Sequence, residues 1–155
     1  MTEIDFALKQ EDAADIVELV GTVLWNKAND NNTFRNLSFA EQTFVYIDIF
    51  ESEINNEGLY GFFYNTSGEF THNVLQAFID IQAHETATII DKAIKVFKDL
   101  PVPKDIILRR QFISKLDTED LDIWSHLELD LINVKENIVD LVIAHIKLHK
   151  TDFEY

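Results

Sequence analysis

The chain contains no cysteine, which excludes disulfide bonds and cysteine-based zinc sites. Only two prolines and four glycines occur among 155 residues, and 46% of the residues are hydrophobic, so the composition is that of one globular domain. No apolar run reaches the roughly 18 residues that a membrane span needs. The start of the chain, Met-Thr-Glu-Ile-Asp-Phe, lacks the basic and apolar regions of a signal peptide. These absences predict a soluble cytoplasmic protein.

Basic residues are also scarce, because 13 lysines and arginines face 28 aspartates and glutamates and the net charge is −15. A surface of this sign repels nucleic acid and anionic lipid and attracts basic proteins. We therefore expect a basic protein as the partner, and no direct binding to nucleic acid or to a membrane. An ordinary acidic protein also carries such an excess to remain soluble, so charge alone leaves both interpretations open.

Apolar residues recur at helical spacing along most of the chain and predict helices at 13–27, 38–55, 74–81, 87–97, 104–115 and 133–149. Ser38 and Glu41 form a capping box at the start of the second helix, and Pro101 ends the fourth. Residues 127–131 alternate with period two, but their helical flanks favour helix or irregular structure over a strand. The sequence thus predicts one all-α domain, residues 1–155, of about six or seven helices. Its expected core includes Phe50, Phe62, Phe63, Phe78, Ile90, Phe97 and Leu141.

Unusual backbone geometry is expected between residues 51 and 68, which hold three of the four glycines, three asparagines and four aromatic residues. Asparagine side chains can bind backbone groups that are freed where a helix breaks. We therefore interpret this motif as a structural element, formed by Asn55, Asn56, Gly58, Phe62, Phe63, Asn65 and Gly68. The alternative is a polar pocket for a small ligand, lined by Asn55, Asn56, Asn65 and Tyr60.

The motif, together with Leu37-Ser-Phe-Ala-Glu-Gln42 and the helix through Ile81, resembles the bacterial DNA-mimic protein nineteen-like family. That family typically shows Leu-Ser-x-x-Glu-Gln, then Glu-x-x-Asn-Gly-Gly-Phe-x-Gln-Phe-Phe-x-Asn-x-x-Gly. The resemblance covers about residues 37–97, and residues 116–149 fit it more loosely. Three positions depart from the pattern. Glu57 replaces the first glycine of the pair and Gly61 replaces the glutamine, while Leu59 in place of phenylalanine is a mild core change. The resemblance implies a DNA mimic.

The histidines and the remaining motifs do not indicate catalysis. His145 and His149 lie one helical turn apart, a spacing that metal sites use, but they fall on the apolar side of their helix and no third ligand is evident. The sequence also contains no phosphate loop, dinucleotide fingerprint or nucleophile elbow. We expect packed histidines, no metal, no cofactor and no enzymatic activity.

Acidic residues recur one turn apart on the predicted helices, where carboxylates are about 5–6 Å from each other. This spacing is comparable to that of phosphates along DNA. It predicts a partner-binding acidic face that contains Glu11, Asp15, Glu18, Glu41, Asp48, Glu136 and Asp140. One hypothesis is a DNA mimic that sequesters a basic DNA-binding regulator or nucleoid protein. The other is an acidic immunity-type or interaction protein that binds a basic partner without imitating DNA. Either protein would act as a monomer or homodimer.

Overall fold

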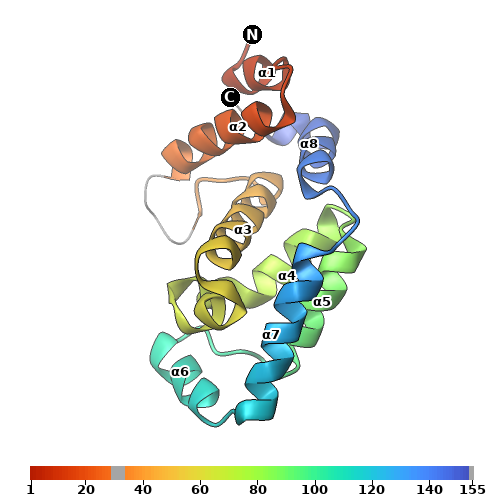
Figure 1. Ribbon diagram of the computed structural model, residues 1–155. Coiled ribbons are helices and arrows are strands. Elements are labelled where there is room, and N and C mark those ends of the chain that lie inside the picture. Colours follow the sequence, from red (N-terminus) through yellow and green to blue (C-terminus); the bar gives the residue numbers. More distant parts are fainter. Residues whose placement is uncertain (29–33, 154–155) are drawn as a thin grey trace.

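The computed structural model describes residues 1–28 and 34–153, and these residues form eight α-helices, two short 3-10 helices and no strand (Figure 1). The all-α prediction is therefore confirmed. None of the described helices is both long and apolar enough to span a membrane. The α-helices are α1 (Glu3–Leu8), α2 (Ala13–Ala28), α3 (Phe39–Tyr64), α4 (Thr71–Asp80), α5 (His84–Ile94), α6 (Ile106–Ser114), α7 (Thr118–Ile132) and α8 (Ile138–Leu148). The 3-10 helices are η1 (Thr66–Phe70) and η2 (Lys150–Asp152).

The helix boundaries differ from the prediction at several places, and α3 continues past the predicted end at residue 55 to Tyr64, with a break at Gly58. The short helix α1 was not expected, and a capping box between Thr2 and Asp5 begins it. The alternating residues 127–131 belong to α7, which begins nine residues earlier at Thr118. The last helix begins at Ile138 rather than residue 133. The Asn137 side chain accepts a hydrogen bond of 3.1 Å from the Asp140 amide and so caps the start of this helix. The loop expected at 29–37 falls partly outside the described residues, at 29–33.

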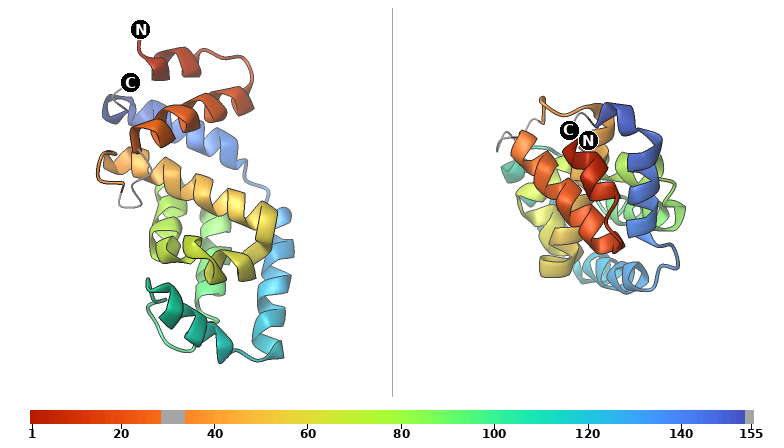
Figure 2. Two further views of the ribbon diagram at one scale, coloured as in Figure 1. Left: turned by 90° about the vertical axis from the view of Figure 1, so that its left-hand side faces the viewer. Right: turned by 90° about the horizontal axis from the view of Figure 1, so that it is seen from above.

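The helices are arranged in layers along an elongated molecule (Figures 1 and 2). Helices α1, α2 and α8 lie at one end, α3 crosses the middle, and α4, α5 and α7 follow, with α6 at the opposite end. The N-terminus and η2 lie at the end that α1 forms, where an ion pair joins Asp5 to Lys150 of η2. Helix α3 thus separates α1, α2 and α8 from α4, α5, α6 and α7.

The core is built largely from the aromatic residues that the sequence indicated. Of the predicted core set only Leu141 is partly rather than fully buried, and it still packs against the core. Trp124 of α7 was not predicted, yet its ring stacks on Phe63 at a centroid distance of 4.8 Å. Its indole Nε1 donates a hydrogen bond of 2.9 Å to the Ala93 carbonyl of α5. This one side chain therefore connects α3, α5 and α7.

Candidate functional site

The family-like motif contains a sharp break in α3 at Gly58. Its backbone angles, φ 71° and ψ −172°, lie in a region that only glycine adopts readily. The break frees the Leu59 amide, which donates a hydrogen bond of 2.6 Å to Glu128 Oε1 of α7. A Cβ atom at position 58 would lie 2.9 Å from Glu128 Cδ, so the approach of this carboxylate also requires glycine. Glu128 therefore caps the second half of α3, where a negative charge is favourable.

The end of the motif surrounds a buried arginine from α6. The Arg109 residue is 0% exposed, and its guanidinium donates hydrogen bonds to four backbone carbonyl groups. Nε bonds to Phe63 at 2.6 Å and Nη2 to Asn65 at 2.6 Å, while Nη1 bonds to Lys104 at 2.9 Å and Pro103 at 3.0 Å. These bonds satisfy carbonyl groups at the C-terminal end of α3 and in the segment before α6.

Gly68 leaves the space that this guanidinium occupies. A Cβ atom there would lie 2.6 Å from the Phe63 carbonyl oxygen and 2.9 Å from Arg109 Cζ. Burial lowers the pKa of the Arg109 guanidinium, and the negative charge of Glu69 acts in the opposite direction. Arginine nevertheless remains protonated in proteins, so the motif encloses a fixed positive charge. The end of α3 is therefore built around this buried charge.

The asparagines of the motif do not act as the sequence suggested. Asn55 and Asn56 are exposed, and their side chains make no hydrogen bond within the described part of the chain. Asn65 contributes its backbone carbonyl to Arg109, while its side chain makes no capping hydrogen bond. The expectation that asparagine amides satisfy the broken helix was therefore wrong, because Glu128 and Arg109 take that role.

The polar pocket proposed for the same asparagines has no common location. Asn55 borders a small cavity of about 140 Å³ between α3 and α7. Tyr60 instead stacks on Tyr64, with a centroid distance of 5.5 Å, and its ring edge meets Trp124. The residues of the hypothetical pocket thus have separate surroundings.

Three of the predicted acidic residues lie together near the start of α2. Glu11 precedes the helix, and Asp15 and Glu18 belong to it. All three side chains are exposed. They lie at the end of the molecule that α1 and α2 form (Figure 1).

Glu41 was placed wrongly on the acidic face, because it is 0% exposed. Its carboxylate accepts hydrogen bonds from Lys27 Nζ at 3.0 and 3.2 Å and from the Ser38 amide at 2.8 Å. The last bond belongs to the capping box that the sequence predicted. The capping role and the buried ion pair therefore remove Glu41 from the surface.

The other three predicted acids differ from one another. Asp48 of α3 is exposed and accepts a hydrogen bond of 2.7 Å from Trp25 Nε1. Glu136 lies before α8, where it accepts hydrogen bonds from the Glu85 amide at 2.5 Å and the Thr86 hydroxyl at 2.9 Å and so caps α5. Asp140 is exposed on α8. Glu136 is thus engaged within the protein, while Asp48 and Asp140 face solvent.

A further group of exposed acids on α7 was missed. Glu119, Asp122 and Asp130 are exposed, and α7 contains no lysine or arginine. Among these residues and the rest of the described chain, the ion pair found on α7 joins Asp120 to Lys98 at 2.9 Å. The acidic run from Asp117 to Asp122 was visible in the sequence, but no helix was predicted there to place these residues on one surface.

The family comparison agrees with the motif. A family model described as DMP19-like protein matches residues 35–149, which is well over half of the chain. The chain belongs to the DMP19-like protein family. Neither the curated proteins nor the solved structures give a match.

Some acidic groups of this DMP19-like protein lie inside the matched region, and others lie outside it. The matched region includes the expected 37–97 and the more loosely fitting 116–149, and it contains α3 to α8 and therefore the acids of α7, Asp48 and Asp140. Helices α1 and α2, with Glu11, Asp15 and Glu18, lie outside it. The contribution of the acids inside the matched region to partner binding can be tested separately from that of the acids outside it.

The two C-terminal histidines pack against each other, and His145 is buried, as the sequence predicted. His145 is buried with Nε2 3.0 Å from the Ala40 carbonyl oxygen, and its ring centroid is 4.8 Å from that of His149. Burial lowers the pKa of His145, and the hydrogen bond with Ala40 acts in the opposite direction. Within residues 1–28 and 34–153, no group of three or more acidic, histidine or cysteine side chains is arranged to hold a metal ion.

Proposed function

We propose that this protein is an acidic binding module that occupies the DNA-binding surface of a basic protein and acts as a DNA mimic. Membership in the DMP19-like family carries the proposal, because that family is named after a DNA-mimic protein. The partner is a basic DNA-binding regulator or nucleoid protein. The module acts by binding rather than by catalysis, and it binds neither nucleic acid nor membranes itself.

The distribution of charge supports a basic partner. The exposed carboxylates of Glu119, Asp122 and Asp130 lie on a helix that contains no lysine or arginine, and the chain as a whole carries −15. Asp48 and Asp140 add exposed negative charge on α3 and α8. Uncompensated surface charge of one sign accelerates association with an oppositely charged protein.

A second function has one observation in its favour. The exposed acids form separate groups, one on α2 at one end of the molecule and one along α7, which runs from the other end to the middle, and Glu41 does not contribute to either (Figure 1). Separate groups suit an acidic interaction protein that covers a local basic patch as well as they suit a duplex-like track. This immunity-type alternative needs no imitation of DNA.

Competition for the partner distinguishes the two functions. The partner is captured from a native lysate on the immobilised protein, eluted with a salt gradient, and mixed with duplex DNA and the free protein in a gel-shift assay. Mutual displacement supports the mimic, whereas a stable ternary complex rejects it and favours the alternative. For a mimic, binding should weaken with salt less steeply than DNA binding, because a folded protein lacks the condensed counterions of DNA.

Two charge-reversal variants locate the binding surface. One changes Glu119, Asp122 and Asp130 to lysine, and the other changes Glu11, Asp15 and Glu18 to lysine, so both alter net charge equally. Reversing charges should slow association more than it accelerates dissociation. A larger effect from one triple identifies the surface that meets the partner, and equal slowing indicates net charge alone. Unchanged association rates in both variants would reject the electrostatic mechanism.

A further inference from the structure

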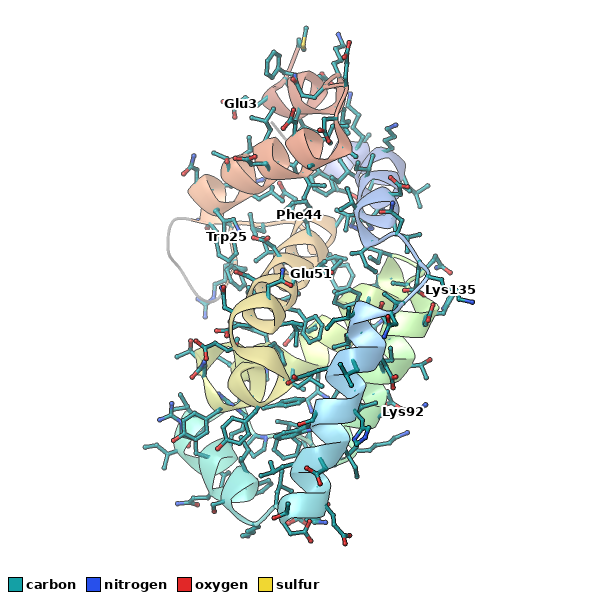
Figure 3. The ribbon with its side chains drawn as sticks, viewed as in Figure 1. Glu3, Trp25, Phe44, Glu51, Lys92 and Lys135 are labelled. Carbon is teal, nitrogen blue, oxygen red and sulfur yellow. The ribbon has the colours of Figure 1, made fainter. Side chains whose placement is uncertain are left out.

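A cavity of about 600 Å³ lies between α2, α3, α8 and the segment that joins α7 to α8. This volume is within the range of roughly 300–1,000 Å³ that is typical of small-molecule sites. Figure 3 shows Phe44 and Glu51 on α3, with Lys135 on the connecting segment. Most of the wall is apolar and is formed by Val17, Phe44, Ile47, Ile138, Val139 and Val142. Such a wall favours a ligand with an apolar body.

One polar group of this cavity lacks a partner. Glu51 is half-buried, and its carboxylate makes no hydrogen bond or ion pair within the described part of the chain. Burial raises the pKa of Glu51, and the nearby charge of Asp48 raises it further. A partly desolvated carboxylate without a partner is unfavourable for folding, so its presence in a cavity requires an explanation.

The other charged groups of the cavity do not supply that partner. Asp48 accepts a hydrogen bond from Trp25, and Glu136 caps α5 through Glu85 and Thr86. Lys135 has an exposed side chain, and no ion pair joins it to Glu51 among the residues described. Three carboxylates against one ammonium group make this cavity attractive to a cation.

Glu51 also lies at the junction of two apolar spaces. Together with Ile138 it borders the smaller cavity of about 140 Å³, whose wall includes Phe50, Ile54 and Leu131. A ligand whose charge rests on Glu51 could therefore extend an alkyl or aryl group along either wall.

We propose that this cavity binds a small amphipathic ammonium compound, with its charged amine on Glu51 and its apolar part against Phe44 and Ile47. An ammonium group would supply the charge-assisted hydrogen bonds that the carboxylate lacks. A carboxylate or phosphate ligand is disfavoured by the three acidic groups, and a neutral apolar ligand would leave Glu51 unpaired. The assignment of this site does not rest on the proposed interaction with a basic protein, although Asp48 belongs to both surfaces.

Nuclear magnetic resonance titration of the full chain tests the site with three probes of equal length. Hexylammonium should produce saturable shifts in amides of the cavity wall, 1-hexanol should bind about tenfold more weakly, and hexanoate should not bind. Equal affinity for hexylammonium and hexanol, or no saturable shift with hexylammonium, would overturn the proposal.

Matched variants separate recognition of the amine from general stability. Glu51→Gln should weaken hexylammonium binding about tenfold, whereas Glu57→Gln makes the same charge change at an exposed site of α3 and should leave binding unchanged. Val139→Trp should block the cavity while it retains the carboxylate. Because Glu51→Gln removes an unpaired charge, its melting temperature should equal or exceed that of the parent, so lost binding cannot be attributed to unfolding. Full affinity in Glu51→Gln would reject the assigned carboxylate.

Discussion

Glu57 and Gly61 lie directly against each other where α3 restarts after Gly58, and a Cβ atom at position 61 would overlap Glu57 Cβ. These are two of the three positions at which the chain departs from the family motif, which usually has glycine at the first and glutamine at the second. A glycine at position 57 would leave the space that a side chain at position 61 needs. The two departures are therefore one coupled change.

This coupling predicts a strongly non-additive pair of substitutions. Gly61→Gln alone should destabilise the protein by about 1–3 kcal/mol, because it overpacks the contact with Glu57. The double variant Glu57→Gly with Gly61→Gln should recover much of that loss, with a coupling free energy of about 0.5–3 kcal/mol. Urea unfolding of the four proteins in the cycle measures it. Additive changes in unfolding free energy would show that the two positions are independent.

The two adjacent arginines should differ sharply in their importance. Arg109→Lys removes the planar fork that binds four carbonyl groups, and each buried carbonyl left unpaired costs about 1–3 kcal/mol. Arg110→Lys is the control, because Arg110 makes one bond of 3.0 Å to the Tyr64 carbonyl and lies 4.1 Å from that ring, nearer the surface. The control should lose no more than about 1 kcal/mol. Equal losses in chemical denaturation would contradict the assigned role of Arg109.

The asparagine and the glycine of the motif should also respond differently. Asn56→Ala should change stability by no more than about 0.5 kcal/mol, because the side chain is exposed and makes no hydrogen bond within the described residues. Gly58→Ala should cost more than about 2 kcal/mol, since it strains a glycine-only conformation and displaces Glu128. Thermal melts of both variants test this contrast. A loss of about 1–3 kcal/mol in Asn56→Ala would instead restore the interpretation based on sequence.

Much of this architecture could be predicted because it depends on residues that are close together in the sequence. Helical spacing indicated the helices, and the Ser38–Glu41 box correctly marked the start of α3. The partners of the motif could not be predicted, because Glu128 is 69 residues from Leu59 and Arg109 is 46 residues from Phe63. No local pattern identifies such pairs.

The prediction of the acidic face failed where helical spacing conflicted with capping and ion pairing. Helical spacing placed Glu41 and Asp48 on one surface, but the capping box and the ion pair with Lys27 bury the first. In α7, period-two alternation over five residues concealed a helix of 15 residues and therefore its exposed acids. Periodicity alone does not show which charged residues have a partner from another helix.

Acidification should weaken the fold through His72. Its Nε2 accepts a hydrogen bond of 3.0 Å from the Val102 amide, which requires an unprotonated nitrogen. Burial lowers the pKa of His72, and the positive charge of Lys104 lowers it further. The unfolded chain therefore binds more protons than the folded chain near pH 6.5. The contribution of His72 to the free energy of unfolding is thus complete above about pH 6.5 and declines as the pH falls.

A comparison of melting curves isolates this residue. His72→Gln retains a side chain of similar reach without a group that titrates in this range. Its melting temperature should decline less than that of the parent between pH 7.5 and 5.5, by a few degrees at most for a change of about 1 kcal/mol. Comparing the two proteins removes the shared effects of His145, Glu51 and the net charge. Parallel curves would exclude the predicted role of His72.

The unequal surroundings of the two tryptophans provide two intrinsic fluorophores with different uses. Trp124 is 1% exposed and stacked on Phe63, so its emission should resist quenching by acrylamide until the core opens. Trp25 is 37% exposed, and its indole is held by Asp48, a residue of the cavity wall. Its emission should respond when a molecule arrives beside Asp48 in the folded protein. Trp25→Phe would leave a chain whose fluorescence reports unfolding alone.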